Sequence, residues 1–238
     1  MSPFSSFQDT GSTVRFVNRQ EAGEKLAETV LEEIRKHPVS EGMRFLVYAL
    51  PRGGLPIAAP VAQRLNCPLD VIVAKKITRP DNQELAIGAV TADGQVVWAP
   101  HWSAFAQTLA QHQTALEQAQ AHAQAQWQDL SPEGTRADPT GAIALVIDDG
   151  IATGMTMAAA VRSLRAQQVA QVWICAPVAP LDLMPFLQEM GDRLIILATP
   201  AIFNSVSRFY KEFPQVSTEE AASYLKDGGW GWGMKKGR

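Results

Sequence analysis

The spacing of apolar residues along the chain changes between two periods, and each period indicates a different kind of element. Short continuous apolar runs, typical of strands buried on both faces, occur at 44–50, 69–74, 144–147, 171–176 and 193–198. Apolar residues at helical spacing occur at 18–34, 55–65, 103–130, 157–165 and 184–190. Alternating residues around Asp93-Gly94 predict a hairpin over 82–98. This order of strands and helices predicts an α/β fold with a central, mostly parallel sheet flanked by helices.

Two adjacent carboxylates, Asp148 and Asp149, follow the apolar run 144–147, and the small-residue loop 150–156 comes next. The carboxyl ends of parallel strands are where open α/β sheets bind ligands. Because the loop leads into a helix, its backbone N–H groups and the helix dipole can converge on a phosphate. The carboxylates repel a phosphate but suit the hydroxyls of a sugar attached to it. The sequence therefore predicts a sugar-phosphate site.

These residues resemble the ribose-phosphate motif of type I phosphoribosyltransferases, in which a strand runs into two acids and an x-x-A-T-G-x-T loop. The resemblance implies the donor 5-phosphoribosyl-1-pyrophosphate. It implies that Asp148 and Asp149 hold ribose hydroxyls or metal-bound water, and that the 5′-phosphate lies on Gly150, Ile151, Ala152, Thr153, Gly154, Met155 and Thr156. Other phosphate motifs do not match, since Gly154 is followed by Met155 where Walker A requires Lys, and no dinucleotide fingerprint occurs in a strand-turn-helix setting.

A second anion-binding turn is predicted one strand earlier, at Pro51, Arg52, Gly53 and Gly54. It resembles the family's pyrophosphate loop, which often contains a non-proline cis peptide, here expected at Pro51-Arg52. Alone, such a sequence also fits an ordinary surface turn. We expect Lys75 and Lys76 to lie at the end of the next strand and to neutralise pyrophosphate, the alternative being a solvated charge pair.

Five motifs in the family's order extend the resemblance over most of the chain. They point to a subgroup of bacterial predicted phosphoribosyltransferases whose acceptor is unassigned. The motifs start at Phe16-Val-Asn-Arg-Gln-Glu-Ala-Gly23 and end at Phe209-Tyr-Lys-Glu-Phe-Pro-Gln-Val216, and between them lie 51–54, 84–90 and 148–154. The resemblance implies that the hairpin is a flexible lid and that a small hood covers the acceptor.

The resemblance also implies Mg²⁺ as cofactor, with Asp148 and Asp149 near it through ribose hydroxyls or water, and Arg52 among the catalytic residues. Ala152 stands where 6-oxopurine transferases have an Asp, so we expect the acid or base to come from Glu84, with Asp81 second and a plain surface role as the alternative. No Lys or Arg occurs between Pro80 and Thr135. The cations for the leaving group must therefore come from Arg52, Lys75, Lys76 and Arg79. Stacking on a flat acceptor and plain core packing are both open for Phe203, Phe209 and Tyr210.

Composition is that of an ordinary globular protein, with 46% hydrophobic and 19% charged residues over 238 positions. The net charge of −3 provides no basic footprint for nucleic acid. No membrane span or signal pattern is visible, and the only cysteines, Cys67 and Cys175, suit unpaired thiols in a cytoplasmic protein. We expect a single domain over residues 1–227 and a flexible Gly/Trp tail over 228–238. The oligomeric state is open, with a homodimer as one alternative.

Two function classes follow. The first is a transferase that moves 5-phosphoribose to a nitrogenous acceptor, such as a nucleobase, and releases pyrophosphate. The second is a non-catalytic sensor or regulator that binds phosphoribosyl pyrophosphate or a nucleotide. A hydrolase or phosphorylase using the same site is a further alternative.

Overall fold

The computed structural model describes residues 16–40, 42–79, 82–99, 109–130 and 137–227. Its centre is a five-stranded sheet in the order β2-β1-β6-β7-β8, in which every neighbouring pair is parallel. The strands are β1 (Phe45–Ala49), β2 (Leu69–Val71), β6 (Ile143–Ile147), β7 (Gln171–Val178) and β8 (Arg193–Ala198). The predicted α/β class is confirmed.

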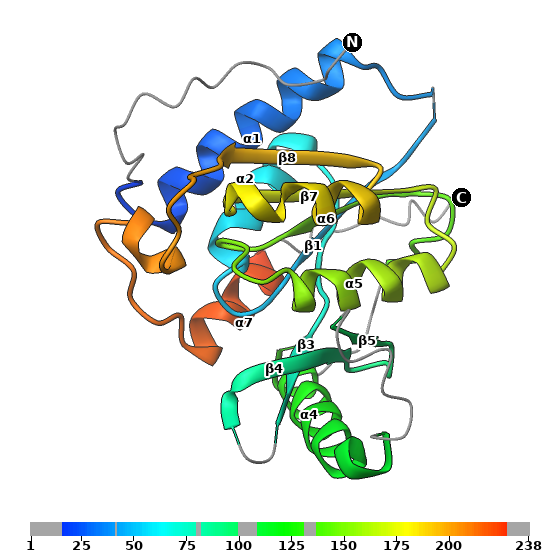
Figure 1. The fold of residues 1–238 in the computed structure, drawn as a ribbon. Helices are drawn as coiled ribbons and strands as arrows, with labels where there is room; N and C mark the ends of the chain where they lie inside the picture. The colour runs from blue at the N-terminus through cyan, green and yellow to red at the C-terminus, as the bar shows by residue number, and fades with distance from the viewer. Residues whose placement is uncertain (1–15, 41, 80–81, 100–108, 131–136, 228–238) are drawn as a thin grey trace.

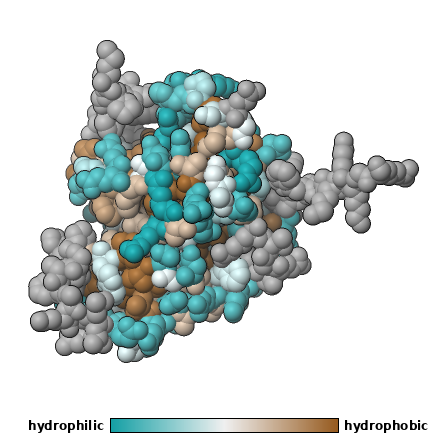
Figure 2. Space-filling view, turned by 90° about the vertical axis from the view of Figure 1, so that its right-hand side faces the viewer, coloured by the Kyte–Doolittle hydropathy of each residue, from teal (hydrophilic) through white to brown (hydrophobic). Residues whose placement is uncertain are grey.

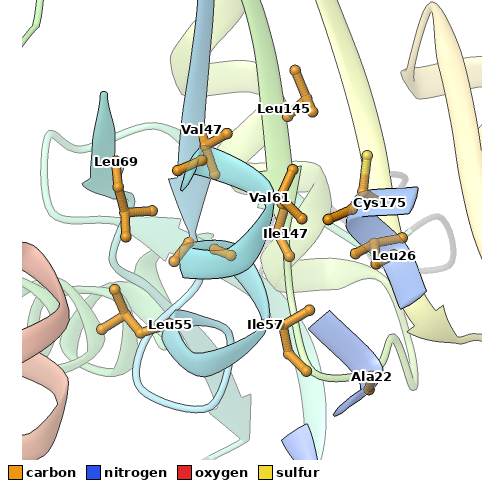
Figure 3. Close-up of a cluster of buried hydrophobic side chains, with 14 of the residues drawn as sticks. Ala22, Leu26, Val47, Leu55, Ile57, Val61, Leu69, Leu145, Ile147 and Cys175 are labelled. Atoms are coloured by element: carbon orange, nitrogen blue, oxygen red, sulfur yellow. The ribbon is translucent and has the colours of Figure 1, made fainter. Parts of the chain in front are cut away.

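Helices cover both faces of this sheet (Figure 1). On one face lie α1 (Arg19–Lys36), α2 (Leu55–Leu65) and α7 (Thr218–Asp227), and on the other lie α5 (Met155–Ala166) and α6 (Met184–Met190). Alternate strand residues supply the two cores, as the two-residue period of a strand requires. Val47, Leu145 and Cys175 face α1 and α2 (Figure 3), whereas Leu46, Ala144 and Ile174 face α5.

The predicted hairpin is present as β4 (Asn82–Thr91) and β5 (Val96–Trp98), in a second sheet of order β3-β4-β5. Its first strand, β3 (Ala74–Arg79), is antiparallel to β4. Helix α4 (Leu109–Leu130) packs on this sheet, with Ile77, Ile87, Val90 and Ala119 buried between them. The start of the helix predicted over 103–130 lies outside the described residues.

The hairpin is attached to the main body through α5, the helix that follows the two carboxylates. Ala89 of β4 is buried against Met155 and Ala159. Ser163, 2% exposed, donates a hydrogen bond from its Oγ to Oδ2 of Asp93 at the hairpin turn, 2.7 Å away. The side of the molecule in Figure 2 is largely hydrophilic, with a hydrophobic area in its lower part.

Shorter elements complete the chain. The 3-10 turns η2 (Leu181–Leu183) and η3 (Val206–Phe209) follow β7 and β8 respectively. Cys67 and Cys175 are buried free thiols, as predicted. Among the described residues, no helix has the length and apolar character needed to cross a membrane. The tail predicted over 228–238 lies outside the described residues.

Candidate active site

Two loops meet where the order of the parallel sheet reverses, between β1 and β6. In the order β2-β1-β6-β7-β8 the chain moves outward in one direction from β1 and in the other from β6. Such a switch point opens a crevice beyond the carboxyl ends of the two strands. The loop 51–54 follows β1 and the loop 148–154 follows β6, and the Leu50 N–H donates to the Ile147 carbonyl oxygen at 2.8 Å. The two anion-binding segments predicted from the sequence are thus neighbours.

The loop after β1 is tight and lies close to β6. The peptide bond between Pro51 and Arg52 is cis, as the family resemblance implied. A Cβ at Gly54 would lie 2.5 Å from the Leu50 carbonyl oxygen and 2.7 Å from that of Ile147. Gly54 is therefore required for the close approach of this loop to β6.

The loop after β6 turns directly into a helix. Gly154 has φ +72°, a left-handed conformation that favours glycine, and α5 begins at Met155, two residues before the predicted start. Thr156 thus lies in the first turn of α5, while Ala152 and Thr153 are exposed on the loop. The first N–H groups of a helix have no partner within the helix, so the loop 150–156 has backbone donors suited to a phosphate. The Ile151 N–H is not one of them, because it donates to the Val178 carbonyl oxygen at 2.9 Å. The Met155 side chain is buried and only its backbone is available.

The carboxylates of Asp148 and Asp149 differ in their surroundings. The Asp149 N–H donates to Oδ1 of Asp148 at 2.8 Å. Burial, together with the neighbouring Asp149 charge, raises the pKa of Asp148 well above its ordinary value. Burial also raises the pKa of Asp149, but Arg19 opposes the effect by favouring the ionised form. An anionic pair without external cations is therefore unfavourable here, and ligands that donate hydrogen bonds or bring cations stabilise it.

Arg19 is the site residue that sequence reasoning missed. Its Nε lies 2.8 Å from Oδ2 of Asp149, and the two side chains are 10% and 15% exposed. Its guanidinium lies 3.6 Å from the ring centroid of Phe213. The first and last sequence motifs contain Arg19 and Phe213, so the signal was present, but residue spacing alone could not show that both motifs meet at Asp149.

The predicted cation pair is placed differently from the prediction. β2 ends at Val71 and a new strand begins at Ala74, so Lys75 and Lys76 lie inside β3 and not at the end of a parallel strand. The chain leaves the parallel sheet at this point because Val73 bonds to the hairpin, accepting from the Ala92 N–H at 2.9 Å. Burial, and after it the charge of Arg52, lower the pKa of Lys75. Lys76 is exposed.

Arg52 itself is held by the C-terminal helix. Its Nη1 lies 3.2 Å from Oγ1 of Thr218, the first residue of α7. Of the predicted acid-base residues, Glu84 lies in β4 and Asp81 lies outside the described residues.

The C-terminal aromatic residues belong to the core in this structure. Phe209 and Tyr210 are 4% and 5% exposed, and Phe203 stacks on Phe209 with a centroid distance of 5.4 Å. A Cβ at Gly150 would lie 2.5 Å from Cγ1 of Val206, so the segment that carries these aromatics packs closely against the start of the loop 150–156. Core packing, one of the two alternatives for these residues, is the one observed.

Metal ligands supplied by the chain alone are few. Within the described residues, no group of three or more His, Cys, Asp or Glu side chains is arranged to hold a metal ion. The adjacent Asp148 and Asp149 offer hard oxygen donors of the kind Mg²⁺ prefers, and Mg²⁺ usually takes its remaining ligands from water and substrate phosphates. The pair fits a magnesium ion that arrives with a phosphorylated substrate.

A family model and a solved structure are similar to this chain. The family model described as "Phosphoribosyl transferase domain" matches residues 16–184, which include both loops and Arg19. The crystal structure of TT1426 from Thermus thermophilus has a TM-score of 0.75 at 28% sequence identity, and the match covers 90% of this chain and 98% of that one.

Two curated relatives come from Mycobacterium tuberculosis. They are named "Putative phosphoribosyl transferase MT0597" (strain CDC 1551 / Oshkosh) and "Putative phosphoribosyl transferase Rv0571c" (strain ATCC 25618 / H37Rv). Each is 35% identical over an alignment of 217 residues, and the match covers 88% of this chain and 46% of the relative. The chain thus spans about half the length of these relatives. With most of its residues matched by the family model, the chain belongs to the phosphoribosyl transferase family.

Proposed function

We propose that the chain transfers the 5-phosphoribosyl group of 5-phosphoribosyl-1-pyrophosphate to a nitrogenous acceptor, a nucleobase or a similar compound, and releases pyrophosphate. The observation that carries this proposal is the meeting of two loops at the β1/β6 switch point. Loop 51–54 has the turn of an anion site, and loop 148–154 joins two carboxylates to a helix N-terminus. A donor with a phosphate, two hydroxyls and a pyrophosphate matches these features in order.

Each part of the donor has a proposed partner. The backbone N–H groups of 152–156 and the hydroxyls of Thr153 and Thr156 anchor the 5′-phosphate. Asp148 and Asp149 accept hydrogen bonds from the ribose hydroxyls. The pyrophosphate lies on 51–54, where Arg52 supplies positive charge, and Lys75 and Lys76 add to it from β3. Binding at the remote 5′-phosphate makes energy available to the transition state.

A bound magnesium ion would be held near Asp148 and Asp149 through ribose hydroxyls or water, and would contribute charge neutralisation at the pyrophosphate. The chain's own residues have a different task. The bond between C1 and the pyrophosphate oxygen breaks, the bond from the acceptor nitrogen to C1 forms, and the acceptor proton leaves to a base. Positive charge develops on the ribose as pyrophosphate departs, so carboxylates at the ribose hydroxyls and cations at the leaving group both lower the barrier.

Glu84 is the proposed base. It belongs to β4, in the hairpin that the family resemblance identifies as a lid. A base here needs only to take the proton from the attacking nitrogen. The acceptor remains unassigned, and Ala152 in place of an Asp argues against 6-oxopurine chemistry through that position.

A non-catalytic sensor of phosphoribosyl pyrophosphate or of a nucleotide is the second candidate. The observation that favours it is the absence of Lys and Arg from 80 to 135, which includes the hairpin. A lid without cations cannot add positive charge to the leaving pyrophosphate. The sensor therefore binds the donor as the transferase does but releases no pyrophosphate.

Pyrophosphate release from the donor, measured with Mg²⁺ and with a panel of nucleobases and other amines added one at a time, tests the proposal. A transferase releases pyrophosphate only when its acceptor is added. Release without acceptor indicates hydrolysis, and donor binding without release under any acceptor indicates the sensor.

Two further expectations accompany this function. Both cysteines are free and buried, which suits a reducing compartment, and we propose a cytoplasmic enzyme. Burial raises the pKa of Cys67 to about 12 and so suppresses its thiolate. A homodimer stays a prediction.

A further inference from the structure

Arg19 occupies a position that local physical chemistry disfavours. It is the first residue of α1, where the helix dipole is positive, and its side chain is 10% exposed. Arginine is seldom buried unless it is paired, and a cation at a helix N-terminus gains nothing from the dipole. Sequence choices that break local rules are concentrated at functional sites, so the contacts of this side chain explain the position.

Three contacts fix the plane and the position of the guanidinium. Nε donates to Oδ2 of Asp149 at 2.8 Å, and Nη1 donates to the Pro214 carbonyl oxygen at 2.6 Å. The face of the group lies on the Phe213 ring, 3.6 Å from its centroid. The flat, forked guanidinium makes all three contacts at once, which a lysine ammonium cannot do.

The backbone that precedes Arg19 is hydrogen-bonded to the segment 209–214, which includes Phe213 and Pro214. The Phe16 N–H donates to the Phe209 carbonyl oxygen and the Lys211 N–H donates to that of Phe16, both at 2.8 Å. The Tyr210 hydroxyl donates to the Asp149 carbonyl oxygen at 2.6 Å. Asp149 is thus held at two points, its side chain by Arg19 and its backbone carbonyl by Tyr210.

We propose that Arg19 is a positioning residue for the donor site: it fixes the orientation of the Asp149 carboxylate that accepts a ribose hydroxyl. This inference rests on the proposed function, because it assigns the hydroxyl to the phosphoribosyl donor. A carboxylate has two oxygens and Arg19 bonds Oδ2, so Oδ1 can accept the hydroxyl while the ion pair is kept.

Calorimetric titration of the Mg²⁺ complex of phosphoribosyl pyrophosphate into the full chain tests this. Arg19→Met keeps the length and the packing on Phe213 but removes the hydrogen bonds to Asp149 and Pro214. Its donor affinity should fall by about tenfold or more, the scale on which groups that orient a ligand-binding side chain act.

A double-mutant comparison separates positioning from a general structural effect. If Arg19 acts through Asp149, Arg19→Met in an Asp149→Asn background changes donor affinity by no more than about twofold. Arg19→Lys keeps the charge without the fork, so its affinity should lie between wild type and Arg19→Met. It also keeps the test available if Arg19→Met does not fold.

Arg193→Met is the matched control. Arg193 also pairs with a carboxylate, that of Glu33, and also lies over an aromatic ring, that of Trp173, with a distance of 5.1 Å to the centroid. It begins β8 and so lies at the opposite edge of the parallel sheet from β2, two strands away from β6. Its removal should lower thermal stability and leave donor affinity unchanged.

The outcomes are distinct. A wild-type chain that binds no donor overturns the proposed function, and this inference with it. A wild-type chain that binds the donor, together with a folded Arg19→Met variant of unchanged affinity, overturns the positioning role alone. An equal loss in the wild-type and Asp149→Asn backgrounds also overturns it.

Discussion

Gly53→Ala perturbs the site through a single methyl group. A Cβ at this position would lie 2.0 Å from Oδ2 of Asp149, 2.7 Å from its Cγ and 3.3 Å from Nε of Arg19. Ordinary contact begins at 3.4 Å, so the carboxylate oxygen has to move by about 1.4 Å or the loop 51–54 has to move away from it. Either movement separates the pyrophosphate loop from the carboxylate pair or breaks the 2.8 Å bond between Asp149 and Arg19.

The expected loss follows from the bonds at risk. A hydrogen bond to a charged group contributes about 1.5–3 kcal/mol, so loss of the hydroxyl contact with Asp149 should weaken donor binding by roughly 10- to 150-fold. Calorimetric titration with the donor and Mg²⁺ measures this, and thermal unfolding reports the cost of overpacking, about 1–3 kcal/mol. Gly191→Ala is the control, because a Cβ there meets mainly the Ile174 side chain at 3.0 Å, away from both loops. Unchanged donor affinity in Gly53→Ala would refute the reasoning that the close packing of loop 51–54 on Asp149 determines donor affinity.

Three further predictions concern the surroundings of the site. Because burial raises the folded-state pKa of Asp148, its ionisation destabilises the folded chain at neutral pH, by about 1.4 kcal/mol per pKa unit. Asp148→Asn should therefore raise the melting temperature at pH 7–8, with the gain shrinking as the pH falls toward the ordinary pKa of about 4. A lower melting temperature at neutral pH would contradict this. Ser163→Ala leaves Asp93 without its 2.7 Å bond and should cost about 1–3 kcal/mol in denaturant unfolding, and no change in the midpoint would contradict it. Thr218→Val removes the contact with Arg52 and should weaken inorganic pyrophosphate binding by up to about tenfold while leaving ribose 5-phosphate binding unchanged. An equal loss for both ligands would show that Thr218 acts on the whole site.

Elements with a strong local pattern were predictable from the sequence. The apolar run before Asp148 is β6, and all its residues are buried, as expected for a strand covered on both faces. Asn18, a residue type typical of helix starts, caps α1 by accepting from the Glu21 N–H at 3.0 Å. The loops 51–54 and 150–156 were recognisable because each needs glycine at a fixed offset from a strand end.

Features that depend on distant contacts were not predictable in the same way. The continuous apolar run 69–74 predicts a single strand. In the structure β2 ends at Val71, because the Val73 carbonyl oxygen accepts its hydrogen bond from Ala92 of the hairpin region. The pairing of Arg19 with Asp149 joins residues 130 positions apart. Aromatic residues such as Tyr210 fit a core or a stacking surface equally well until their neighbours are known.

The most direct test of the central assignment is a crystal structure of the chain with 5-phosphoribosyl-1-pyrophosphate and Mg²⁺. The account predicts ribose hydroxyls within hydrogen-bond distance of Asp148 and Asp149, the 5′-phosphate on the backbone of 150–156 and the pyrophosphate on 51–54, with the bond from Arg19 to Asp149 retained. A donor bound elsewhere, or an empty β1/β6 crevice at saturating donor concentration, would contradict it.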